Sequence, residues 1–110
     1  LEAYAKVVEL NPDDAEAWLD YSSLLYELNK YDEAIEVINE AIKCNPDEAS
    51  LYYRMTAYLF VSGKYTMALN YLEIALNTEP EKHHILFEYL PQLQGNHVIL
   101  DIIKKYTAHN

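Results

Sequence analysis

Apolar side chains recur every three or four residues through the middle of the chain, which predicts amphipathic helices. A first run ends near residue 28, and its apolar face comprises Trp18, Tyr21, Ser22, Leu25 and Leu28. A second run starts near residue 31, and its face comprises Tyr31, Ala34, Ile35, Ile38, Ala41 and Ile42. We therefore expect two consecutive helices here, each burying one side.

Residues that end helices separate these runs. Asn29 and Gly63 both tolerate the left-handed conformation that commonly follows the last helical turn. Pro46 stops the second run, because proline lacks a backbone N–H and disfavours helix in the residue before it. Asp13 and Asp47 are expected to cap or open the helices that follow.

The same pattern returns after a shift of 34 residues. Residues 29–48 read NKYDEAIEVINEAIKCNPDE, and residues 63–82 read GKYTMALNYLEIALNTEPEK. One helical hairpin cannot bury its whole apolar face alone, so repeated hairpins stack on one another. Small residues are expected where the helices approach closely, namely Ser22, Thr56, Ala34 and Ala68.

These residues resemble the tetratricopeptide repeat family, a 34-residue helix-turn-helix with an early Trp, a small residue, Leu, two later Ala and a final Pro. The matching positions are Trp18, Ser22, Leu25, Ala34, Ile38, Ala41 and Pro46, then Tyr52, Thr56, Leu59, Ala68, Leu72, Ala75 and Pro80. Ser22 and Thr56 replace the usual Gly of the family, and Tyr52 replaces Trp. The resemblance implies an all-α fold, an α-α superhelix in which antiparallel helix pairs form a right-handed solenoid.

The domain organisation follows from this register. We expect a single domain, 1–110, with full repeats at 15–48 and 49–82, the second helix of a truncated repeat at 1–12, and degenerate capping helices at 83–110. A break is expected at Leu90–Pro91, then a last helix from about Asn96 to Tyr106 whose buried stripe is Val98, Ile99, Ile102, Ile103 and Tyr106. Because the chain begins at Leu1 without Met, it is expected to be a fragment of a longer protein.

The resemblance also implies a concave groove, lined by the first helix of each repeat, that binds a peptide or protein segment. By position, the groove candidates are Leu19, Ser23, Tyr26, Glu27, Tyr53, Arg54, Ala57, Phe60, His84 and Phe87, with Glu16, Asp20, Ser50 and Glu88 at the edges. Tyr26, Tyr53 and Phe60 fit either the groove or the core, whereas Tyr21, Tyr31, Tyr52 and Tyr65 are expected in the core. Arg54 is the only cation at or beside the positions of the family's clamp for chaperone tails, which argues against that ligand class.

The net charge of −10 narrows the choice of partners. No basic stripe exists, so we expect neither nucleic acid nor an anionic membrane surface as a partner. Residues 1–55 carry 13 acidic and 4 basic side chains, a balance of −9, against 5 and 4 in residues 56–110. A neutral or basic protein or peptide is therefore favoured near the first half.

Catalytic and cofactor signatures are missing from the sequence. His83, His84, His97 and His109 lack the spacing of a helical metal pair, and the two glycines form no phosphate loop. Cys44, the single cysteine, is expected to be a small buried residue in a reducing, cytoplasmic setting. We expect no enzyme and no cofactor; the alternative function is self-association, as a homodimer through the open N-terminal helix.

Overall fold

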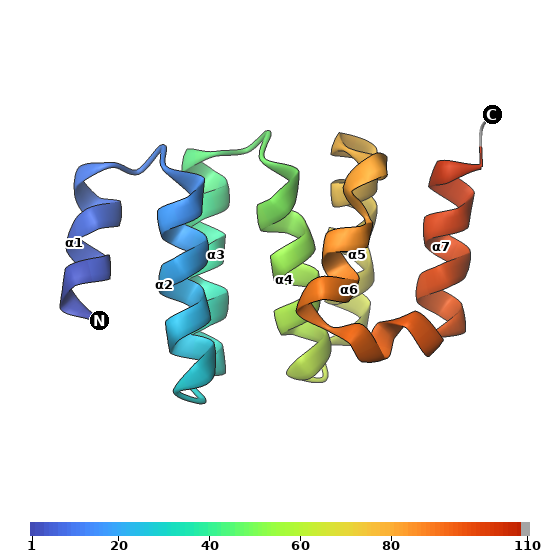
Figure 1. Cartoon of the computed structure of the whole chain (residues 1–110), viewed down its shortest axis with the longest axis horizontal. Helices are drawn as coiled ribbons and strands as arrows, with labels where there is room; N and C mark the ends of the chain where they lie inside the picture. Colours follow the sequence, from blue (N-terminus) through green and yellow to red (C-terminus); the bar gives the residue numbers. More distant parts are fainter. Residues whose placement is uncertain (109–110) are drawn as a thin grey trace.

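The computed structural model describes residues 1–108, and over that range the chain is helical without any strand (Figure 1). The seven α-helices are α1 (Glu2–Leu10), α2 (Ala15–Glu27), α3 (Tyr31–Cys44), α4 (Ala49–Val61), α5 (Tyr65–Thr78), α6 (His84–Tyr89) and α7 (His97–Thr107). Two short 3-10 helices, η1 (Pro80–Lys82) and η2 (Pro91–Gly95), flank α6. The predicted all-α fold is confirmed.

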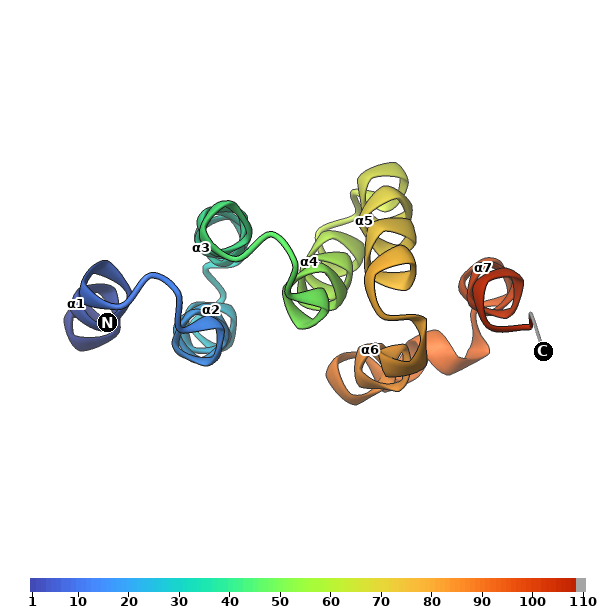
Figure 2. The ribbon, with the colours of Figure 1, turned by 90° about the horizontal axis from the view of Figure 1, so that it is seen from above.

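The helices pack as consecutive antiparallel pairs, α2 with α3 and α4 with α5, in a TPR-like superhelix. Both pairs start and end at positions 34 residues apart, since Ala15 matches Ala49 and Cys44 matches Thr78. Seen from above in Figure 2, α2 and α6 lie on one side of the row and α3 and α5 on the other. Helix α4 lies between them and contacts all four, so it is the central element of the molecule.

The turns between paired helices have the predicted geometry. Asn29 has a φ of 63° and Gly63 a φ of 77°, both in the left-handed region in which helices commonly end. Gly adopts this conformation without strain, and Asn adopts it with little strain. The helix starts differ from expectation by one residue. Asp14, not Asp13, caps α2 by accepting from the backbone N–H of Ala17 at 3.2 Å. Before α4 the N-cap position is Glu48 rather than Asp47, and its side chain makes no capping hydrogen bond.

Close helix packing explains the small residues. Ser22, Ala34, Thr56 and Ala68 are all fully buried, as predicted. The two hydroxyls avoid a desolvation penalty by donating to the preceding turn, Ser22 to the Leu19 carbonyl and Thr56 to the Tyr52 carbonyl, each at 2.9 Å. A polar side chain is therefore tolerated at this contact because its partner lies in its own helix.

Several predicted core positions are wrong. Of the four tyrosines expected in the core, Tyr52 is buried, Tyr21 and Tyr31 are half-buried, and Tyr65 is 58% exposed. Tyr65 is the first residue of α5 and lies beside the α4–α5 turn. Cys44 is exposed as well, because it is the last residue of α3.

The segment after α5 does not repeat the hairpin. The break at Leu90–Pro91 and the last helix are confirmed, since α6 ends at Tyr89 and α7 starts at His97. However, α6 packs on α4 whereas α7 packs on α5, and the two helices do not lie against each other (Figure 2). Ile99 and Ile103 are buried on α7, but Val98 is 55% exposed, which corrects its place in the buried stripe.

Candidate functional site

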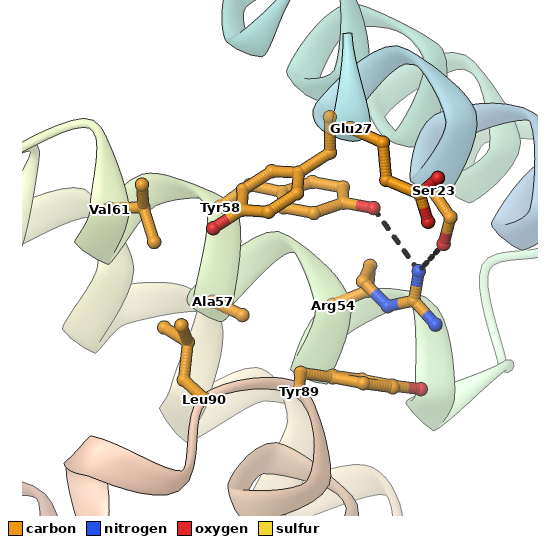
Figure 3. A pocket seen from close by; sticks show the side chains of 9 residues that line it. Ser23, Glu27, Arg54, Ala57, Tyr58, Val61, Tyr89 and Leu90 are labelled. Carbon is orange, nitrogen blue, oxygen red and sulfur yellow. Dashed lines mark hydrogen bonds between the residues drawn. The ribbon is translucent and has the colours of Figure 1, made fainter. Parts of the chain in front are cut away.

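A hollow of about 250 Å³ opens between α2, α4 and the end of α6 (Figure 3). Its lining residues are Ser23, Tyr26, Glu27, Arg54, Ala57, Tyr58, Val61, Tyr89 and Leu90. We call it the first hollow. Its walls combine aromatic and aliphatic surface with a few polar groups, the mixture that is typical of ligand sites.

Arg54 joins the three helices at one end of the first hollow. Its Nη1 atom donates to the Ser23 hydroxyl of α2 and, at 3.1 Å, to the Tyr58 hydroxyl of α4 (Figure 3). The guanidinium carbon lies 3.9 Å from the centre of the Tyr89 ring of α6, a cation–π contact. The Tyr58 hydroxyl also pairs with the Ser22 hydroxyl at 3.0 Å. This network fixes the relative positions of α2, α4 and α6.

The charge of Arg54 is stabilised by its aromatic neighbours. Burial lowers the pKa of Arg54, but Tyr58 and Tyr89 outweigh that effect, so its pKa lies above the ordinary arginine value. Within residues 1–108, no carboxylate lies within ion-pair distance of Arg54. Its Nε is buried and finds no acceptor among these residues. A permanent cation is thus held by ring faces, two hydroxyls and the Leu19 carbonyl, which accepts from Nη1 at 3.5 Å.

One wall of the first hollow is a pair of stacked tyrosines. The rings of Tyr26 and Tyr58 lie 5.2 Å apart with their planes at 19°. The ring of Tyr31 also packs against that of Tyr26, with the ring centres 5.1 Å apart and the planes at 58°. Burial, followed by the neighbouring Tyr31 and Tyr58, raises the pKa of Tyr26 above its ordinary value. The stack gives a flat and rigid surface with few rotatable bonds.

A second hollow of about 490 Å³ adjoins the first along the same face. The two share Arg54 and Tyr89, and the second is otherwise lined by Glu16, Leu19, Glu48, Ser50, Lys82, His84 and Ile85. It contains more charge than the first, with Lys82 paired to Glu79 at 3.2 Å. We call the two hollows together the concave groove.

The groove contains seven of the ten predicted candidates. Ser23, Tyr26, Glu27, Arg54 and Ala57 line the first hollow, and Leu19 and His84 line the second. Leu19 and Ala57 are nearly buried, so they form the floor and expose little area.

The other three candidates lie elsewhere. Tyr53 is fully buried and its hydroxyl donates to the Glu79 carbonyl at 2.8 Å, so it belongs to the core. Phe87 is half-buried and packs on the core formed with α7. Phe60 lines a separate hollow of about 510 Å³ between the α4–α5 turn and the η2–α7 segment. Its other lining residues are Tyr65, Leu69, Gln92, Leu93, Asn96 and Val98.

Sequence reasoning missed four residues of the first hollow: Tyr58, Val61, Tyr89 and Leu90. Val61 is detectable in principle, because it is the equivalent of the predicted Glu27 after the 34-residue shift. Tyr89 and Leu90 have no such signal. Tyr89 is the last residue of α6 and Leu90 follows it, and the early end of this helix breaks the register on which the positional transfer depends.

Other kinds of site find no support in the described part of the chain. Residues 1–108 contain no group of three or more His, Cys, Asp or Glu side chains placed to hold a metal ion. His109, one of the four histidines, lies outside the described residues. None of the described helices has the length and apolar character needed to cross a bilayer.

A family comparison agrees with this architecture. The family model for the tetratricopeptide repeat matches residues 1–58, more than half of the 110 residues. The chain therefore belongs to the tetratricopeptide repeat family, whose repeats are protein-interaction modules and typically non-catalytic. No curated protein matches the chain.

Proposed function

We propose that the chain binds a peptide or protein segment in the concave groove formed by α2, α4 and α6. The observation that carries this proposal is the first hollow, whose walls are mostly apolar and whose geometry is fixed by the Arg54 network before any ligand arrives. A preformed site spares the ligand much of the cost of ordering the protein. Binding, rather than chemistry, is the activity that these residues support.

The test uses the one exposed aliphatic residue at the end of the first hollow. Val61 is 38% exposed there, so Val61→Arg fills the hollow without disturbing the core. We expect Val61→Arg to weaken binding of every peptide selected from a random library by at least about tenfold, measured by fluorescence anisotropy. Met67→Arg is the matched control, because Met67 is exposed on α5 and lines none of the three hollows. Equal affinities for the wild type and Val61→Arg would refute the groove as the binding site.

A second candidate function, self-association, is favoured by exposed apolar residues on α1. After the 34-residue shift, Tyr4 and Val7 correspond to Ile38 and Ala41 of α3, which are fully buried. Tyr4 and Val7 themselves are 37% and 40% exposed. An apolar face of this kind favours association with a second copy.

Sedimentation velocity over a wide concentration range tests this candidate. A dimer that Val7→Lys converts to a monomer would support it, since Val7 is surface-exposed and its loss leaves the core intact. A monomer at every concentration would exclude it and leave the groove as the only proposed interaction surface.

A further inference from the structure

We propose that the segment bound in the concave groove is basic, with one bulky apolar anchor in the first hollow and Lys or Arg residues on both sides facing the carboxylates of α2. This inference rests on the proposed function, because it names the chemistry of the occupant of the same groove. It commits to a basic segment of a partner protein.

Three carboxylates form an acidic line on α2. Glu16, Asp20 and Glu27 are all exposed, and α2 contains no Lys or Arg. Because a helix turns by about 100° per residue, spacings of four and seven residues place the three within about 40° of one another around the axis. We call them the acidic ridge.

The acidic ridge faces the groove. A shift of 34 residues brings its members onto Ser50, Arg54 and Val61 of α4, and all three of these line the hollows. Two of the ridge residues line the hollows themselves, one in each. The ridge therefore borders the path that a bound segment would follow.

The ridge has no cation to neutralise it. The ion pairs in residues 1–108 are Lys6–Glu9, Lys43–Glu40 and Lys82–Glu79, and none of them involves α2. Two cations line the two hollows: Arg54, which makes none of these ion pairs, and Lys82, which is paired to Glu79. The three negative charges of the ridge therefore outnumber the one lining cation that has no carboxylate partner. Cationic side chains on a partner would relieve this repulsion and increase the rate of encounter.

Arg54 determines where the cations of the partner can lie. Its guanidinium is held between Ser23, Tyr58 and Tyr89, so it forms a fixed positive end wall of the first hollow. A second cation would be repelled there. The remaining wall consists of the stacked Tyr26 and Tyr58 together with Ala57, Val61 and Leu90, which suits an apolar side chain. The anchor therefore enters the hollow, and the cations stay at its edge.

The length of the ridge sets the length of the motif. Eleven residues separate Glu16 from Glu27, which is a rise of about 16 Å along the helix. An extended peptide covers that distance in about five residues. The basic residues are therefore expected within two or three positions of the anchor on each side.

The experiment compares four synthetic peptides of roughly nine residues. Three carry a central Leu anchor flanked by Lys, Gln or Glu pairs, and the fourth replaces Leu by Gly between Lys pairs. Affinities for the full chain are measured by fluorescence anisotropy at about 50 and about 300 mM salt, which shortens the screening length by a factor of about 2.4. We expect the Lys-flanked Leu peptide to bind at least about tenfold tighter than the Glu-flanked one at low salt. The Gly-centred peptide is expected to lose most of the affinity.

A matched pair of variants separates the ridge from the overall charge of the chain. The first combines Glu16→Gln, Asp20→Asn and Glu27→Gln, and the preference for Lys should disappear. The second combines Glu33→Gln, Glu36→Gln and Asp101→Asn, three exposed sites that line none of the three hollows. It removes the same charge and should keep the preference.

The outcomes distinguish this inference from the proposed function. Equal binding of the three Leu peptides, or an equal effect of the two triple variants, would overturn the charge assignment and leave the groove as a binding site. No binding of any peptide, from this set or from the random library, would overturn both.

Discussion

Equivalent residues of the two repeats make the same hydrogen bond through different groups. The Trp18 indole N–H donates to the Pro12 carbonyl at 2.8 Å, and the Tyr52 hydroxyl donates to the Pro46 carbonyl at 2.7 Å. Each pair joins the first helix of a hairpin to the turn that precedes it. Tyr replaces Trp here and keeps the hydrogen bond, because both side chains are large and mostly apolar and both have a hydrogen-bond donor at the far end of the ring system.

The small residues at the helix contacts are the most sensitive positions for packing. We expect Ala34→Leu or Ala68→Leu to destabilise the fold by about 1–3 kcal/mol, because both sites are fully buried and a larger side chain forces the helices apart. Thermal melts should show a midpoint lower by roughly 5 °C or more. Glu36→Gln, at an exposed site, is the control and should melt like the wild type. Equal melting points for all three variants would contradict this packing argument.

The ionisation of Tyr53 is expected to make the free energy of unfolding depend on pH in the alkaline range. Burial, helped by the nearby Glu81 and Glu79, raises the pKa of Tyr53 well above the value of about 10 of an unfolded tyrosine. Below about pH 10, Tyr53 is protonated in both the folded and the unfolded state, so its contribution to the free energy of unfolding is fully present. Above it, the unfolded state loses its proton first, so the free energy of unfolding should fall with rising pH.

The measurement is chemical denaturation at neutral pH and at several alkaline values. Tyr53→Phe should reduce the slope of stability against pH above 10 or so, since the ionisable group is gone. Tyr65→Phe removes a hydroxyl from an exposed residue and should keep the slope. An unchanged slope in Tyr53→Phe would show that this residue does not control the alkaline response.

The sequence predicts the burial of small residues better than it predicts whether a large amphipathic residue is buried or lines the groove. Ser22 and Ala34 have one possible role at a close helix contact, and both are buried as predicted. Tyr53 was equally compatible with groove and core, and the position of α6 decided the matter. Its ring joins the cluster that contains Leu86 and Leu90. No periodicity within α4 contains that information.

At the scale of elements, α6 departs most from the repeat. It has only six residues, and Leu90 and Pro91 follow its last residue. The equivalent helices α2 and α4 continue for about two further turns. The sequence signalled this break, because Leu90 stands where Ser22 and Thr56 stand in the earlier units. It did not predict that α6 would pack on α4 while α7 packs on α5. The reading of residues 83–110 as a cap stays a prediction.

The contact between Arg54 and Tyr89 is expected to hold α6 in place. Tyr89→Ala removes a cation–π contact worth about 0.5–2 kcal/mol. We expect faster amide exchange across α6, with α2 and α3 unchanged, in hydrogen–deuterium exchange followed by mass spectrometry. Tyr65→Ala, which removes an exposed ring, should leave the exchange of α6 as in the wild type. Unaltered exchange in Tyr89→Ala would mean that apolar packing, including that of Leu86, secures this helix without the cation–π contact.

At the scale of the whole molecule, two regular hairpins and one irregular segment together make the groove. The regular part follows from the 34-residue period and was predictable, including both left-handed turns. The irregular part supplies Tyr89 and Leu90, which complete the first hollow. The sequence therefore predicted the floor of the groove and one of its sides. The other side depends on how a short helix docks, which is a property of the assembled fold.

An amide NMR titration with pooled basic, acidic and apolar peptides tests the central claim most directly. We predict that shifts will cluster at the residues of the first hollow, with the exposed face of α5 unaffected. These residues are Ser23, Tyr26, Glu27, Arg54, Ala57, Tyr58, Val61, Tyr89 and Leu90. Shifts confined to α1, or no shifts with the linewidths of a dimer, would contradict the account and identify self-association as the role of this chain.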